Sequence, residues 1–179
     1  MALNATIFKA SLQIADLDRN YYQDHALTLA RHPSETDERM MVRLLAFALN
    51  ADDTLAFGRG LSADDEPDLW KRDLTGDIRL WIAVGLPEDK AMRKACNRAD
   101  AVRVYSYGGQ AASVWRRQLG STWGKQRPAN LEVFSLDGQG TRELAQLARR
   151  NMTLQVTIQE GRALVTDGDR MAELQPETI

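Results

Sequence analysis

The segment Ile78-Arg-Leu-Trp-Ile-Ala-Val-Gly85 decides the fold of this chain. Trp81 and Ala83 lie on one face of the expected strand, and isoleucine, leucine and valine occupy the other. A strand that is apolar on both faces is covered on both faces, which is typical of the middle of a sheet. We therefore expect residues 78–84 to form a central strand.

The residues that follow predict a strand–helix–strand unit. Pro87 suits the first turn of a helix, Glu88 and Asp89 place negative charge there, and residues 101–107 resume a strand. A connection of this length predicts parallel pairing with a right-handed crossover. The helix has a buried stripe (Met92, Ala95, Cys96 and Ala99) and an exposed basic row (Lys90, Lys94 and Arg98).

The residues before the central strand predict a helix and a strand meander. Ser34 is a natural N-cap after Pro33, so we expect a helix over residues 35–49. A short apolar segment at 55–60, an acidic turn and a segment at 69–72 lead from that helix to the central strand. Residues 35–107 therefore predict a core of helix, strands, helix and strand.

Further elements flank this core. Residues 5–31 alternate in two runs around a turn, which predicts an N-terminal antiparallel strand pair. Residues 110–167 predict a C-terminal extension with a helix at 110–119, a strand at 131–136, a helix at 141–150 and a hairpin that turns at Glu160-Gly161. We expect the polar residues after 167 to be frayed. The 179 residues thus predict one domain of mixed α/β class, with a mixed sheet flanked by helices.

Composition limits the class of protein. A net charge of −2 argues against a general basic coat for nucleic acid, but it is compatible with a local basic patch. The single Cys96 allows no intramolecular disulfide and no cysteine zinc site. No apolar run approaches the ~20 residues that span a bilayer, and the N-terminus lacks a signal-peptide pattern. We expect a soluble, cytoplasmic protein without membrane contacts.

Several familiar catalytic motifs are absent from the sequence. There is no Gly-x-x-x-x-Gly-Lys phosphate loop, no Gly-x-Gly-x-x-Gly and no Gly-x-Ser-x-Gly. The two histidines, His25 and His32, have no metal-binding partner at helical spacing. These absences argue against kinases, dehydrogenases, esterases and zinc hydrolases.

Carboxylates are the remaining candidates for chemistry. Glu38 lies on the apolar stripe of the 35–49 helix, and Asp64, Asp65, Glu66 and Asp68 crowd the entry to a strand. Oxygen ligands suit Mg²⁺ or Mn²⁺, and such a metal can activate water for attack on a phosphodiester. Two other interpretations stay open: Glu38 as a helix-start acid at the rim of the core, and the acidic turn as a solvated loop.

Several motifs match those of a known family. They are Leu17-Asp-Arg19, Arg31-His-Pro-Ser-Glu-Thr-Asp-Glu-Arg-Met40, Phe57-Gly-Arg-Gly-Leu-Ser62, Asp65-Glu-Pro67 and Leu80-Trp-Ile-Ala-Val-Gly85. Over nearly its whole length the chain resembles the YaeQ family of small bacterial proteins. That family resembles the PD-(D/E)XK, or restriction-endonuclease-like, nucleases in fold. The core of these nucleases has a helix, a strand meander, a helix and a further strand, which is the order predicted for residues 35–107.

The resemblance implies a metal site with three carboxylates. Glu38 matches the acid on the first core helix of the family. Asp65 and Glu66, before Pro67, match the acidic position at the edge of the second core strand. With Mg²⁺ or Mn²⁺ as the implied metal, these residues would be its ligands.

The sequence also departs from the family pattern. Ala83 stands where the third strand usually carries Glu, and Gly85 stands where a Lys is usual. A lost ligand commonly costs about 10–100-fold in metal affinity or activity, so Ala83 implies reduced or lost cleavage. The nearest replacements are Lys94 or Lys71 for the lysine, and Asp77 or Asp68 for the carboxylate.

Two functions follow from these residues. The first is a nuclease-like protein that acts on or binds nucleic acid through a Mg²⁺-dependent, degenerate phosphodiesterase site. Its phosphate contacts would come from Arg59, Lys90, Lys94, Arg98 and Arg116. The alternative for the basic row is an ordinary solvated helix face.

The second function is non-enzymatic, as an interaction or regulatory protein that retains the fold. Trp115 and Trp123, with arginines and lysines beside them, would form the surface for a protein partner. For Trp115 the alternative is burial in the core, because Ala111, Val114 and Trp115 share one helical stripe.

Overall fold

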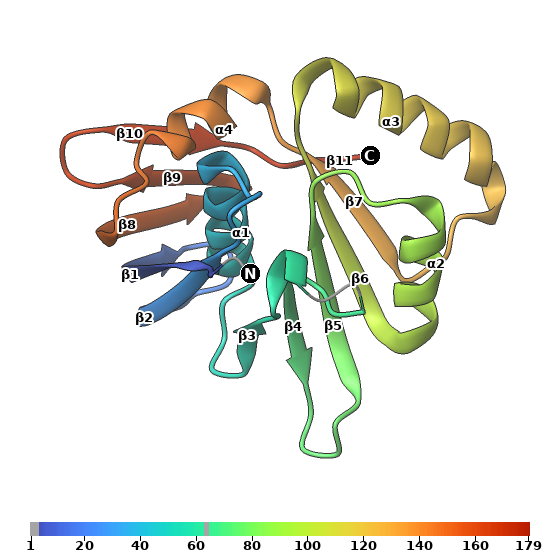
Figure 1. Cartoon of the computed structure of the whole chain (residues 1–179), viewed down its shortest axis with the longest axis horizontal. Helices are drawn as coiled ribbons and strands as arrows, with labels where there is room; N and C mark the ends of the chain where they lie inside the picture. Colours follow the sequence, from blue (N-terminus) through green and yellow to red (C-terminus); the bar gives the residue numbers. More distant parts are fainter. Residues whose placement is uncertain (1–3, 63–64) are drawn as a thin grey trace.

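The computed structural model, which describes residues 4–62 and 65–179, contains two β-sheets that share one helix (Figure 1). Helix α1 (Asp37–Asn50) lies between the sheets. The strand orders are β10-β9-β8-β1-β2 and β11-β7-β6-β5-β4-β3. Each sheet contains parallel and antiparallel pairs, so the single mixed sheet expected from sequence is corrected to two mixed sheets within one α/β domain.

The first sheet brings the two ends of the chain together. It consists of β1 (Thr6–Asp16), β2 (Tyr21–Arg31), β8 (Asn151–Gln159), β9 (Arg162–Thr166) and β10 (Met171–Leu174). β1 and β2 pair antiparallel, which confirms the N-terminal strand pair. β1 also pairs in parallel with β8. Phe8 and Leu12 are buried in the core around α1, whereas alternate residues of β1 are exposed on the outer face.

The second sheet contains the predicted central strand. It consists of β3 (Leu55–Phe57), β4 (Leu69–Arg72), β5 (Ile78–Val84), β6 (Ala99–Ser106), β7 (Leu131–Ser135) and β11 (Glu177–Thr178). β5 lies antiparallel to β4 and parallel to β6, which confirms both the central strand and the crossover. Helices α2 (Asp89–Arg98) and α3 (Gly109–Trp123) cover the face of this sheet that points away from α1.

Helix α1 forms the middle of the main core. Every residue from Met40 to Ala48 is buried. Thr36, not Ser34, is the N-cap, and its hydroxyl accepts a hydrogen bond from Arg39 N at 3.1 Å. Ser34 instead bonds the ring of His32, and Glu35 turns into the core. The helix therefore begins at Asp37, two residues later than predicted.

The C-terminal residues form two strands, so the expectation that they fray is wrong. β10 places Ala172 and Leu174 in the core, beside helix α4 (Gly138–Ala145). After β11, Ile179 N donates a hydrogen bond to Val133 O at 2.9 Å. These strands are too short to show a clear pattern, and their stability comes from the partners that they meet.

Two helices differ in extent from the prediction. α3 continues to Trp123, because the buried Trp123 side chain packs into the apolar cluster beneath it. α4 begins at Gly138 rather than 141, since Asp137 caps it by accepting a hydrogen bond from Gly140 N at 2.7 Å. Across the described ranges, no helix is both long enough and apolar enough to span a membrane.

Candidate functional site

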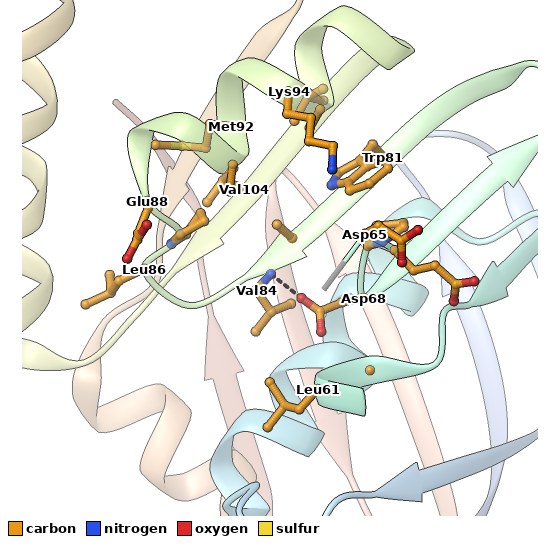
Figure 2. Close-up of a pocket in the computed structure, with 18 of the residues that line it drawn as sticks. Leu61, Asp65, Asp68, Trp81, Val84, Leu86, Glu88, Met92, Lys94 and Val104 are labelled. Atoms are coloured by element: carbon orange, nitrogen blue, oxygen red, sulfur yellow. Dashed lines mark hydrogen bonds between the residues drawn. The ribbon is translucent and has the colours of Figure 1, made fainter. Parts of the chain in front are cut away.

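A cavity of about 570 Å³ opens between β5, α2 and the segment that precedes β4 (Figure 2). It lies on the face of the second sheet that α2 covers, and its far wall comes from Val102 and Val104 of β6. The residues of α2 that face it are mainly small or apolar, such as Ala91, Met92 and Ala95. This volume falls within the ~300–1,000 Å³ range of small-molecule sites.

Ala83 of β5 lines this cavity, at the position where the family resemblance led us to expect Glu. Its methyl group cannot ligate a cation, and Ala91, Met92 and Ala95 of α2, which line the same cavity, are apolar. The central strand therefore supplies an apolar surface at the place where a metal ligand would project.

Asp68 is the buried carboxylate of the cavity wall. Its Oδ2 accepts a hydrogen bond from Val84 N at 2.8 Å, drawn as a dashed line in Figure 2. Its Oδ1 accepts a second bond from Arg39 Nη2 at 2.9 Å. The sequence placed Asp68 in the acidic cluster before the strand and named it as a possible substitute for the missing Glu. The available signal was its place after Pro67 and directly before the strand at 69–72.

Arg39 of α1 joins Asp68 to a buried ion-pair network. It contacts Glu35 Oε1 at 3.2 Å, and Glu35 also pairs with the buried Arg43 at 2.7 Å. Burial alone would lower the pKa of Arg39, but the charges of Asp68 and Glu35 outweigh this and raise it. Arg39 therefore stays cationic and neutralises Asp68.

The structure brings Asp65 and Glu66 to the cavity, and both have arginine contacts. Glu66 pairs with Arg59 at 3.1 Å and accepts a hydrogen bond from Arg59 N. The hydrogen bond from the Arg59 side chain lowers the pKa of Glu66. The exposed Asp65 accepts a hydrogen bond from Arg98 Nη1 at 2.8 Å through its backbone carbonyl. Asp64 lies outside the described residues.

Glu38 is placed differently from Asp65 and Glu66. It is half-buried and is not part of the cavity lining. Its Oε1 accepts a hydrogen bond from the hydroxyl of the buried Thr141, on α4, at 3.0 Å. The structure thus gives Glu38 a polar partner at the rim of the core.

The predicted metal ligands do not converge. Within residues 4–62 and 65–179, no group of three or more Asp, Glu, His or Cys side chains is arranged to hold a metal ion. Asp68 is the carboxylate next to Ala83, and a cationic guanidinium already occupies one of its oxygens. This donor set does not fit Mg²⁺ or Mn²⁺, which are bound through carboxylates that are free to ligate.

The basic row on α2 reaches the cavity in part. Lys94 and Arg98 line it, whereas Lys90 does not. Figure 2 shows the Lys94 amine directed towards Trp81, and the Arg98 guanidinium lies 5.1 Å from the centre of the Trp81 ring. Of the two candidates for a migrated lysine, Lys71 instead pairs with Asp52 outside the cavity.

The two tryptophans of the proposed partner surface differ in burial. Trp123 is only 2% exposed and belongs to the apolar cluster with Trp81. Trp115 is half-buried and donates its Nε1 hydrogen to Pro87 O at 2.9 Å. Arg116, proposed as a phosphate contact, binds the hydroxyls of Ser113 and Ser135. Trp115 thus packs in part against the core, in the direction of the core interpretation offered for it, and Trp123 is buried there.

Comparisons with known proteins agree with the motif-based resemblance. The family model described as "YaeQ protein" matches residues 1–176. The chain is 49% identical over 175 residues to the uncharacterized protein YaeQ of Salmonella typhi, with 98% of this chain and 96% of the relative covered. It is 48% identical over 174 residues to the Escherichia coli K12 relative, with 97% and 95% covered.

Two solved structures have the same fold. The YaeQ protein from Xanthomonas axonopodis pv. citri matches with a TM-score of 0.92 and 53% identity, covering 97% of each chain. The YaeQ protein from Pseudomonas syringae matches with a TM-score of 0.92 and 35% identity, covering 98% of this chain and 96% of the other.

Proposed function

This chain belongs to the YaeQ family, and we propose that it is a cytoplasmic nucleic-acid-binding protein with a degenerate nuclease-like site. The order α1, β3, β4, β5, α2 and β6 supports a core of the PD-(D/E)XK type, because it follows the sequence of helix, meander, helix and strand. In that arrangement the metal site would lie where β4 begins and β5 ends, which is the position of Asp68 and Ala83.

The observation that carries the proposal is the state of Asp68. Its two oxygens accept hydrogen bonds from Arg39 and from Val84 N, and its neighbour on the central strand is Ala83 rather than an acid. Binding a divalent cation there would require breaking the pair with Arg39 and placing two cations side by side. Both steps oppose metal binding.

The basic row supports binding without cleavage. Lys90, Lys94 and Arg98 follow one another at intervals of four on an exposed helix face, so the row extends over about 12 Å. Charges of this kind contact phosphates, and affinity for them falls as salt rises. The partner-surface alternative is less well supported, because Trp123 is buried in the core and Trp115 packs in part against it.

The metal part is tested by calorimetry with Mn²⁺ on the wild type, Ala83→Glu and Asp68→Asn, alongside an assay for oligonucleotide cleavage. We expect no saturable heat at millimolar Mn²⁺ and no cleavage for the wild type. Ala83→Glu should give saturable heat in the same Mn²⁺ range, a gain in affinity of about tenfold or more over the wild-type limit, because it restores a carboxylate beside Asp68. Ala26→Glu, on the exposed face of β2, is the matched control and should behave as wild type.

Metal-dependent cleavage by the wild type that Asp68→Asn abolishes would refute the degenerate site. Nucleic-acid binding is measured separately, by fluorescence anisotropy of a labelled single-stranded oligonucleotide over a range of salt. The double variant with Lys90→Ala and Lys94→Ala should weaken binding. It should also reduce the slope of the logarithm of the binding constant against the logarithm of the salt concentration by about 1.4, at ~0.7 per phosphate contact. Lys9→Ala, on the exposed face of β1, should leave both quantities unchanged.

A further inference from the structure

We propose that the cavity beside Ala83 receives one base of a single strand, turned out of its stack while its phosphate lies on α2. This inference rests on the proposed function and specifies how the same site recognises its ligand. It concerns recognition alone and requires no metal. Three observations lead to it: the origin of the space, its position along the basic row, and the polar groups of its wall.

The space is produced by small side chains on facing elements. Ala83 projects from β5, and Ala91 and Ala95 project from α2, where longer side chains would fill the gap. This open pocket of about 570 Å³ has the volume of a small-molecule site, which is ~300–1,000 Å³. Leu61, a large apolar side chain that is 41% exposed, lines the same cavity. An apolar wall with an exposed leucine suits the faces of a planar ring.

The cavity opens beside the cations that would hold a strand. Lys94 and Arg98 line it, and Lys90 precedes them on the same helix face. Each interval of four residues in this row corresponds to about 6 Å along the helix axis. A strand whose phosphates contact this row would carry its bases past the opening. Lys94 is exposed, and none of the ion pairs between described residues includes its amine, so the amine is available to a phosphate.

The acceptors of the wall are carboxylates, which lie beside the cations Arg39, Lys94 and Arg98. Asp68 lies inside and Asp65 lies near Trp81, as Figure 2 shows. A carboxylate offers about four lone-pair sites, so Asp68 keeps acceptor capacity beyond the bonds from Arg39 and Val84 N. Carboxylates accept from the amino group of cytosine but meet only a carbonyl oxygen at the same place on thymine. The cavity should therefore prefer cytosine to thymine.

The test compares labelled dodecamers of deoxycytidine and of thymidine by fluorescence anisotropy, at low salt and with a metal chelator present. We expect the wild type to bind the cytidine strand about tenfold more tightly, as one accommodated base can contribute. Ala83→Leu and, independently, Ala91→Leu fill the cavity and should remove this difference by weakening binding of the cytidine strand to the level of the thymidine strand. Ala91 is exposed, so its variant does not depend on core repacking, and circular dichroism verifies both folds.

Two controls separate the cavity from the basic row. Lys94→Ala should weaken both strands equally, and Ala26→Leu, on the outer face of β2, should weaken neither. If both strands bind and the filled variants keep the wild-type preference, or if there is no preference, the cavity inference is wrong while nucleic-acid binding stands. If neither strand binds at low salt, the inference and the proposed function both fail.

Discussion

Arg43 and Glu35 form an ion pair whose two side chains are 2% and 1% exposed. Such a pair gains little net stability, because removing both charges from water costs about as much as their attraction returns. Removing only one partner costs much more than the pair contributes, because the partner that remains is then a buried charge without compensation. Arg39 contacts the same carboxylate at 3.2 Å, so it would relieve part of that penalty.

Arg43→Met should therefore lower the free energy of unfolding by about 3 kcal/mol. The double variant Arg43→Met with Glu35→Gln should recover a measurable part of that loss, because the orphaned charge is gone. Urea unfolding measures both. Arg162→Met, which breaks an exposed pair with Glu173, is the control and should cost less than about 1 kcal/mol. A loss in Arg43→Met as small as in this control would contradict the buried-charge argument.

At the scale of an element, the β4–β5 hairpin turns around Asp73. Its carboxylate accepts hydrogen bonds from the Thr75 hydroxyl and from the backbone N–H groups of Thr75 and Asp77, and it pairs with Arg79. The Thr75 hydroxyl makes the largest contribution, and together these bonds lower the pKa of Asp73 to about 2. The turn thus prefers the charged form of Asp73 to the neutral one.

This shift predicts a pH dependence for the hairpin. Because the folded-state pKa is lowered, the stabilisation is complete above the unfolded value of about 3.9 and is lost as pH falls through about 2. Asp73→Asn should be less stable than the wild type at pH 7, and the two should converge as the pH approaches 2. Chemical denaturation at several pH values measures this. A difference that stays constant from pH 7 to 2 would show that the charge is not responsible.

On the scale of the whole molecule, the two sheets share one core. Residues from both sheets pack around α1 in a single apolar cluster, and the parallel pair β1–β8 ties the N-terminal strands to the C-terminal ones. The N-terminal strand pair therefore has no separate core of its own. Unfolding of one sheet would expose the apolar side chains of α1 that the other also needs.

We therefore expect one cooperative unfolding transition. The four tryptophans, at positions 70, 81, 115 and 123, all belong to the second sheet or to α3, so their fluorescence reports only that half. Phe8→Ala, in the first sheet, should nevertheless lower the free energy of unfolding by about 3–5 kcal/mol. The denaturation midpoints measured by tryptophan fluorescence and by far-UV circular dichroism should fall by the same amount. Different midpoints by fluorescence and by circular dichroism would show that the sheets unfold independently.

The sequence by itself determined the features that depend on near neighbours. Two apolar faces within 78–84 identified a central strand, and alternation within 5–31 identified a hairpin, because side-chain period follows directly from backbone geometry. The helical spacing of Lys90, Lys94 and Arg98 likewise placed one exposed row on α2. The motifs were also sufficient to identify the family, which the matched model confirms.

Only the tertiary structure decided which distant groups meet. Arg39 could have faced solvent, but the packing of α1 against β5 directs it to Asp68. Glu38 could have faced the cavity, but α4 presents Thr141 to it instead. The strands after residue 167 are too short for their own pattern to specify them, and they exist because β9 and β7 offer free edges. Local periodicity cannot encode such choices, since each depends on a partner supplied by a remote part of the chain.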